Sequence, residues 1–91
     1  MAAQQYESVI PLTNLPIGNT ATVATISATG LLHRLLLDLG FVPGTVVVPE
    51  RLSPFGDPRS YRIRRSLFAL RDSEARHIWV RQALQELPDV E

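Results

Sequence analysis

Four side chains of the kinds that bind metals or move protons are spread along the chain: His33, Asp38, Asp57 and His77. A Zn²⁺ or Fe²⁺ site needs three or four such ligands in fixed geometry. These four follow no metal-ligand spacing, and the chain has no cysteine to supply a thiolate. Each histidine is expected at the surface or half-buried. We therefore predict no metal site within one chain and no cofactor.

Sequence motifs of phosphate-binding and hydrolytic enzymes are missing. No Gly-rich run ends in Gly-Lys-Ser/Thr, and no G-x-S-x-G occurs. A single domain of 91 residues buries only about 60–65% of its unfolded surface, which leaves little room for an enclosed substrate pocket. We predict that the protein is not an enzyme.

Four arginines lie close together in the sequence: Arg59, Arg62, Arg64 and Arg65. Small barrels with a basic groove and stacking aromatic residues bind oligonucleotides. Here nine basic residues balance nine acidic ones, and strand alternation separates the arginines from the apolar residues. The sequence favours a solvated strand face, with docking of an acidic partner as the alternative, and no nucleic acid partner.

The segment PFGDP, residues 54–58, favours a turn-forming role for Asp57. Pro54 and Pro58 restrict φ, Gly56 permits a positive φ, and Asp57 can accept hydrogen bonds from nearby backbone N–H groups. We expect a rigid loop between two strands, with Phe55 either under the loop or offered at its tip. A second, compatible interpretation makes loop 53–59 part of a docking surface.

The segment LLHRLLLDLG has the period of an amphipathic helix. A helical wheel places five leucines within about 140° of arc: Leu31, Leu32, Leu35, Leu36 and Leu39. Ser27 or Thr29 can cap the start, and Gly40 can close the end in a left-handed conformation. Leu37 falls opposite the stripe, which predicts an exposed leucine and a partner surface, unless the helix is buried on two sides.

Short β-branched runs predict strands at residues 21–27, 45–48, 61–64, 67–70 and 78–80. Pro43-Gly44 suits a type II turn, and Pro49 indicates an edge or a bulge. Asp72 or Ser73 is expected to cap one helical turn before the last strand. The predicted fold is mainly β, a small barrel with one inserted α-helix and a short C-terminal helical turn.

Four stretches, in this order, resemble the FeoA family, ferrous iron transport protein A: LPIGNTATV, LLLDLGFVPGT, PFGDPRSY and FALRDSEARHIWV. The resemblance spans residues 8–81 and implies an SH3-like β-barrel there. Residues 1–7 are polar and expected to be flexible, and residues 82–91 form a polar tail.

The resemblance also implies a function. It indicates a small cytoplasmic accessory protein that contacts the cytoplasmic GTP-binding region of the ferrous iron permease FeoB and meets the membrane only through that partner. The start of the chain has no signal peptide pattern, and no apolar run approaches the roughly 20 residues of a spanning helix. The alternative is a transition-metal-binding sensor module that signals to a regulator. The oligomeric state and the direction of any effect on GTP hydrolysis stay open.

Two positions depart from the pattern of many family members. Those members have Gly where Arg65 stands, so Arg65 must take a costlier turn geometry, or the turn is of another type. They have Arg or Lys where Leu35 stands, which indicates that Leu35, rather than Leu37, faces solvent. The candidate partner-binding residues are Leu32, Leu35, Leu37, Phe55, Asp57 and Arg59.

Overall fold

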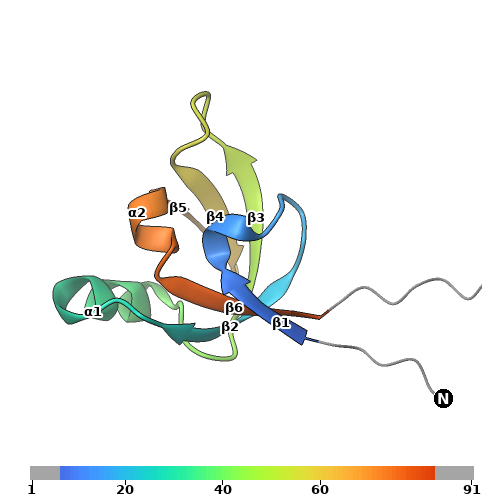
Figure 1. Ribbon diagram of the computed structural model, residues 1–91. Coiled ribbons are helices and arrows are strands. Elements are labelled where there is room, and N and C mark those ends of the chain that lie inside the picture. Colours follow the sequence, from blue (N-terminus) through green and yellow to red (C-terminus); the bar gives the residue numbers. More distant parts are fainter. Residues whose placement is uncertain (1–6, 84–91) are drawn as a thin grey trace, which may run out of the picture.

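Six antiparallel strands form one sheet in the computed structural model, which describes residues 7–83 (Figure 1). The strands are β1 Glu7–Pro11, β2 Ala21–Ile26, β3 Val46–Leu52, β4 Arg59–Ile63, β5 Ser66–Leu70 and β6 Ile78–Ala83. Their order in the sheet is β1-β6-β2-β3-β4-β5. Helix α1 spans Gly30–Leu39, helix α2 spans Asp72–Ala75, and a 3₁₀ turn, η1, spans Leu12–Asn14. None of the described helices is long and apolar enough to cross a membrane.

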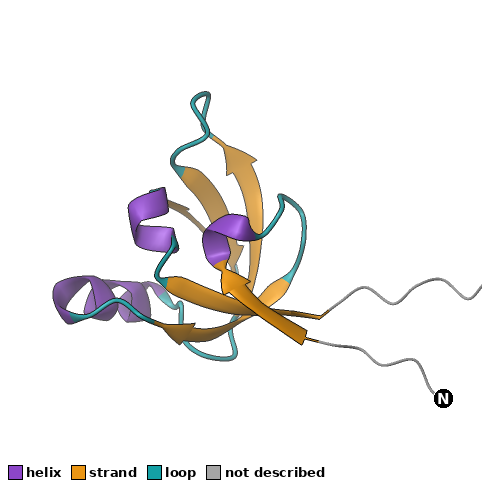
Figure 2. Cartoon of the chain, viewed as in Figure 1, coloured by secondary structure: helices purple, strands orange, loops and turns teal. Residues whose placement is uncertain are grey.

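The sheet curls, with the helices and the 3₁₀ turn beside it (Figure 2). The core consists of buried side chains from the strands together with residues from the helices and connections. Alternation along β4 buries Tyr61 and Ile63, and the same rule buries Ile78 and Val80 in β6. The residues that seal the core from outside the strands are Leu12, Leu15, Leu36 and Phe41. The mainly β fold predicted from the sequence is confirmed.

Strand β1 was not expected, and it begins inside the segment predicted to be flexible. Its pairing partner is β6, with Val9 opposite Arg81 and Ile10 opposite Val80. Strand β6 lies about seventy residues away in the sequence, so no local sequence pattern predicts that β1 pairs with it. Residues 82 and 83, assigned above to a polar tail, continue β6. The remaining parts of both terminal predictions, residues 1–6 and 84–91, lie outside the described residues.

Most of the local turn predictions are confirmed. Gly40 ends α1 with φ 112°, and Gly44 takes φ 95° in a turn closed by a 3.0 Å bond from the Thr45 N–H to the Val42 carbonyl. The β3–β4 register shifts between Pro49 and Arg51, which is the expected irregularity.

The predicted strain at the β4–β5 hairpin falls one residue earlier. Arg64 takes the positive φ, 53°, whereas Arg65 does not. A two-residue hairpin can place its left-handed residue at the first position. The glycine that many family members have at position 65 therefore located the turn correctly but did not identify the residue with the positive φ.

The helical-wheel assignment of α1 is wrong for three leucines, since Leu31 and Leu35 were expected in the buried stripe and Leu37 was expected in solvent. Leu31 is 83% exposed and Leu35 is 46% exposed, whereas Leu36 is fully buried and Leu37 is half-buried. The residues that reach the core are Leu32, Leu36 and Leu39, spaced i, i+4 and i+7. The helix lies beside the sheet (Figure 1). Only this stripe reaches the core, so the rest of the predicted apolar face stays in solvent.

Candidate functional site

Phe55 is the most exposed large apolar side chain in the described part of the chain, at 94%. It sits on the loop between β3 and β4, which projects from the sheet at the top of Figure 1. Two backbone bonds close this loop: Gly56 N–H to the Ser53 carbonyl at 2.9 Å, and Ser53 N–H to the Pro58 carbonyl at 3.1 Å. The structure therefore selects the second of the two expected positions, with the ring offered at the tip of an internally bonded loop.

Asp57 ties this loop to the following helix. Its Oδ1 accepts a 2.9 Å hydrogen bond from the backbone N–H of Asp72, the first residue of α2. Glu74 Oε1 accepts from the backbone N–H of Arg71, also at 2.9 Å. The cap residue is thus Arg71, and the expectation of Asp72 or Ser73 as the cap is wrong. Asp57 keeps a structural role because its carboxylate satisfies a free N–H at the helix start.

Arg59 is buried, at 8% exposure, which contradicts its assignment to a partner surface. Its Nη1 donates to the Thr13 carbonyl at 2.7 Å, and its Nη2 donates to the Leu15 carbonyl at 2.5 Å. Its guanidinium also lies 5.3 Å from the centroid of the Tyr61 ring. Arg59 shares the inward face of β4 with Tyr61, and η1 brings two carbonyl groups to that face. It therefore joins β4 to the segment around η1.

The remaining arginines do not form one basic, stacking surface. Arg62 is paired with Glu50 across β3 and β4, and its hydrogen bond lowers the pKa of the Glu50 carboxyl below the usual value. Tyr61 is fully buried, and burial raises the pKa of its phenol to about 12. Phe68 is half-buried with its ring centroid 6.2 Å from that of Phe41. Neither aromatic ring is open for base stacking.

The exposed leucines of α1 and the Phe55 loop occupy separate parts of the molecule (Figure 1). Leu31 and Leu35 are in solvent, as the family pattern indicated for position 35, while Leu32 and Leu37 are half-buried. The structure does not bring the helix and loop candidates into one patch. They form two separate exposed apolar sites on the domain.

The two histidines have local partners. His33 Nδ1 donates to the Ala28 carbonyl at 3.0 Å. His77 Nδ1 lies 3.5 Å from Ser27 Oγ, which also accepts a 3.2 Å bond from Trp79 Nε1. Within residues 7–83, no three side chains of His, Cys, Asp or Glu gather as a metal site requires.

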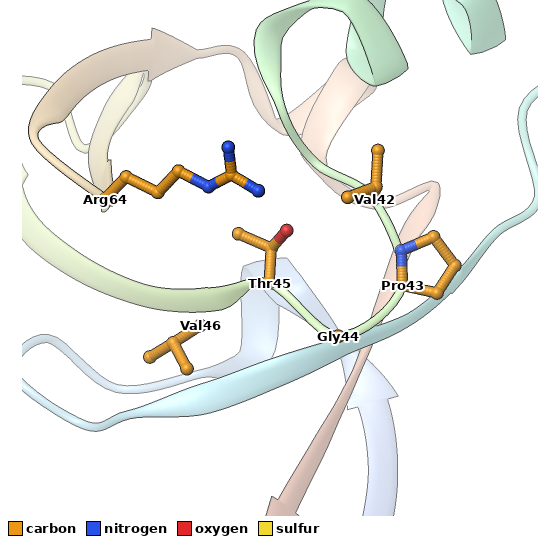
Figure 3. Close-up of a pocket in the computed structure, with 6 residues that line it drawn as sticks. All are labelled: Val42, Pro43, Gly44, Thr45, Val46 and Arg64. Atoms are coloured by element: carbon orange, nitrogen blue, oxygen red, sulfur yellow. The ribbon is translucent and has the colours of Figure 1, made fainter.

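A pocket of about 400 Å³ lies between the turn that precedes β3 and the β4–β5 hairpin (Figure 3). Its lining residues are Val42, Pro43, Gly44, Thr45, Val46 and Arg64. Sequence reasoning found the turn and the hairpin but not the pocket, because the two segments are about twenty residues apart. The only sequence features that could have indicated the pocket were the Pro43-Gly44 turn and the adjacent arginines, Arg64 and Arg65.

A family model described as the FeoA domain matches residues 10–82. The solution structure of a FeoA-like protein from Clostridium acetobutylicum is 32% identical and covers 90% of this chain and 94% of that chain, with a TM-score of 0.75. The FeoA protein from Chlorobium tepidum is also 32% identical, covering 84% and 71%, with a TM-score of 0.74.

A third similar structure is Stenotrophomonas maltophilia FeoA in complex with zinc, described as a procaryotic SH3 domain protein. It is 32% identical and covers 86% of this chain and 89% of that chain, with a TM-score of 0.68. A search of curated proteins finds no match. The similar structures confirm the SH3-like fold that the sequence motifs implied.

Proposed function

Since the chain belongs to the FeoA family, which is associated with ferrous iron transport, we propose that it is an accessory protein that binds the cytoplasmic GTP-binding region of a FeoB-type ferrous iron permease. It acts from the cytoplasm, through protein contact and without catalysing a reaction.

The observation that carries this proposal is the exposure of two large apolar side chains, one on a helix and one on a loop closed by its own backbone bonds. Leu31 is 83% exposed on α1, and Phe55 is 94% exposed on the β3–β4 loop. A small domain gains nothing in its own stability from leaving such side chains in water. Aromatic side chains presented in a fixed position are also typical anchors of protein interfaces.

Both contact points are held in place before any partner binds. The loop is closed by its own backbone bonds and is tied to α2 through Asp57. Helix α1 is held by the burial of Leu36 and by the left-handed Gly40 at its end. Such preorganisation lowers the entropic cost of binding. A rigid domain that touches a GTP-binding region at two points can shift its conformational equilibrium.

The proposal is tested by titrating ¹⁵N-labelled protein with the isolated GTP-binding domain of the permease, with and without a GTP analogue. We expect saturable shifts of the amide signals around residues 30–35 and 53–57. Phe55→Ala and Leu31→Asp should each weaken binding by about tenfold or more, the usual effect of removing an interface anchor. The stability of both variants should stay close to that of the parent, because neither side chain is buried.

Leu67→Ala provides the matched control. Leu67 is a large apolar side chain that is also classed as exposed, at 41% on β5, and it lies neither on α1 nor on the β3–β4 loop. Its replacement should leave the affinity unchanged. Equal losses in all three variants would indicate non-specific hydrophobic association. An absence of shifts at high partner concentration would reject the isolated domain as the partner.

A further inference from the structure

The pocket beside Arg64 has a rigid apolar wall. The Pro43-Gly44 turn that forms it is closed by the bond from the Thr45 N–H to the Val42 carbonyl. It is also joined to β2 by a 2.9 Å bond from the Gly44 N–H to the Val23 carbonyl. The ring of Pro43 fixes the φ angle of that residue and so restricts the turn further. The pocket is therefore formed without a ligand, like most small-ligand sites.

Two polar groups at this pocket have no hydrogen-bonding partner among the described residues. Thr45 is 6% exposed, and its hydroxyl oxygen is buried without a bond. The Arg64 guanidinium is exposed and forms no ion pair or hydrogen bond with any atom of residues 7–83. Figure 3 shows the Arg64 side chain extending across the pocket toward the Thr45 hydroxyl. A buried hydroxyl without a partner is costly, so a ligand that bonds to it recovers that cost.

The backbone of Arg64 is also unusual. It is the one non-glycine residue with positive φ in the part of the chain that the structure describes. Its neighbour Arg65 has the same side chain, an ordinary φ and no place in the pocket lining. Strained residues persist where the surrounding structure requires them, often at binding sites. Here the strained residue is the one that supplies the charge of the pocket.

We propose that this pocket binds a carboxylate attached to a small apolar group. The Arg64 guanidinium pairs with the carboxylate, the Thr45 hydroxyl donates a hydrogen bond to it, and Val42, Pro43 and Val46 contact the apolar part. Because Arg64 is exposed, its side chain can turn to admit the ligand to the hydroxyl. A guanidinium fork matches the two oxygens of a carboxylate.

The pocket chemistry selects against other ligands. One cation and one hydroxyl suit a monoanion, whereas a phosphate dianion needs more donors than the lining offers. A cationic ligand would be repelled by the Arg64 guanidinium and would find no acidic side chain in the pocket lining. This inference extends beyond the proposed permease contact, because neither Leu31 nor Phe55 lines the pocket. Failure of one proposal therefore leaves the other intact.

The test is an amide-shift titration with three probes: N-acetyl-leucine, its neutral amide, and an acetylated glutamate amide whose only carboxylate is in the side chain. The first probe represents a chain terminus and the third an acidic side chain. We expect at least one of the two carboxylates to bind with an affinity on the order of millimolar, shifting the amides of Gly44, Thr45 and Val46. The neutral amide should cause no saturable shift. The tighter of the two carboxylates identifies the natural source.

Matched glycine variants separate binding from folding. Arg64→Gly keeps the positive φ at no steric cost, so the protein should be at least as stable as the parent, yet carboxylate binding should weaken about tenfold or more. Arg65→Gly removes the adjacent guanidinium and should leave binding unchanged. Thr45→Val, which replaces the hydroxyl by a methyl group, should weaken binding roughly threefold to tenfold.

Three results would overturn the proposal. One is equal binding of the neutral amide, and another is undiminished binding by Arg64→Gly. The third is an equal loss of binding in Arg64→Gly and Arg65→Gly, which would indicate general electrostatic attraction.

Discussion

Replacing the buried Arg59 should destabilise the protein far more than replacing an exposed arginine of the same strand. Arg59→Met keeps much of the length and the apolar stem of the side chain but removes both N–H donors. The carbonyl groups of Thr13 and Leu15 then lose the bonds of 2.7 and 2.5 Å that join η1 to β4. The contact with the Tyr61 ring is lost as well.

The magnitude follows from these contacts. Each hydrogen bond from a charged donor contributes about 1.5–3 kcal/mol, and each buried carbonyl left without a donor carries a desolvation cost. Removing a buried guanidinium also relieves its own desolvation penalty, which offsets part of the loss. We expect the free energy of unfolding to fall by about 2–4 kcal/mol. For a domain of this size the Tm then drops by roughly 10–25 °C.

The assay is urea unfolding followed through the fluorescence of Trp79, the single tryptophan. Arg62→Met is the matched control, because Arg62 lies on β4 but is exposed and paired only with Glu50. Exposed ion pairs contribute little, so the control midpoint should stay near that of the parent. Equal midpoints for the two variants would refute the structural role assigned to Arg59.

Three further predictions concern other described residues. Leu36→Ala should lower the free energy of unfolding by about 2–5 kcal/mol because Leu36 is fully buried, whereas Leu31→Ala should change it by less than about 0.5 kcal/mol, both measured in urea. Tyr61 has a pKa raised to about 12, so the folded state binds the phenolic proton more tightly. The contribution of this pKa shift to the free energy of unfolding is complete below about pH 10 and is lost as the pH rises toward 12. Tyr61→Phe should abolish this pH dependence, measured by urea unfolding at a series of pH values. Asp57→Ala should cost about 0.5–2 kcal/mol and speed hydrogen exchange at the Asp72 amide, while Asp57→Asn, which keeps an acceptor oxygen, should lose less.

Features that depend on neighbouring residues were predicted well. The left-handed Gly40 and Gly44, the irregularity at Pro49, the helix and five strands all follow from backbone preferences and side-chain periodicity. The SH3-like fold was implied by the resemblance to the FeoA family and not by these local preferences. The loop that carries Phe55 was predicted in the same way as the turns. The sequence left open whether its ring lies under the loop or at the tip, and the structure places it at the tip.

Features that depend on distant segments were missed or misassigned. Strand β1 forms because β6 offers an edge, and Arg59 turns inward because η1 supplies two carbonyl groups. The wheel showed that α1 is apolar on one side, but how much of that side is buried depends on where the sheet lies. That placement buried Leu36 and left Leu31 in solvent.

By itself, the sequence determined the left-handed glycines, the periods of the helix and of five strands, and the family. Only the tertiary structure decided which leucines are exposed, which arginine is buried, and that Arg64 meets Thr45 at a pocket. The physical reason is that φ, ψ and periodicity are set within a few residues. Burial and binding geometry instead depend on contacts between segments that meet only when the sheet closes.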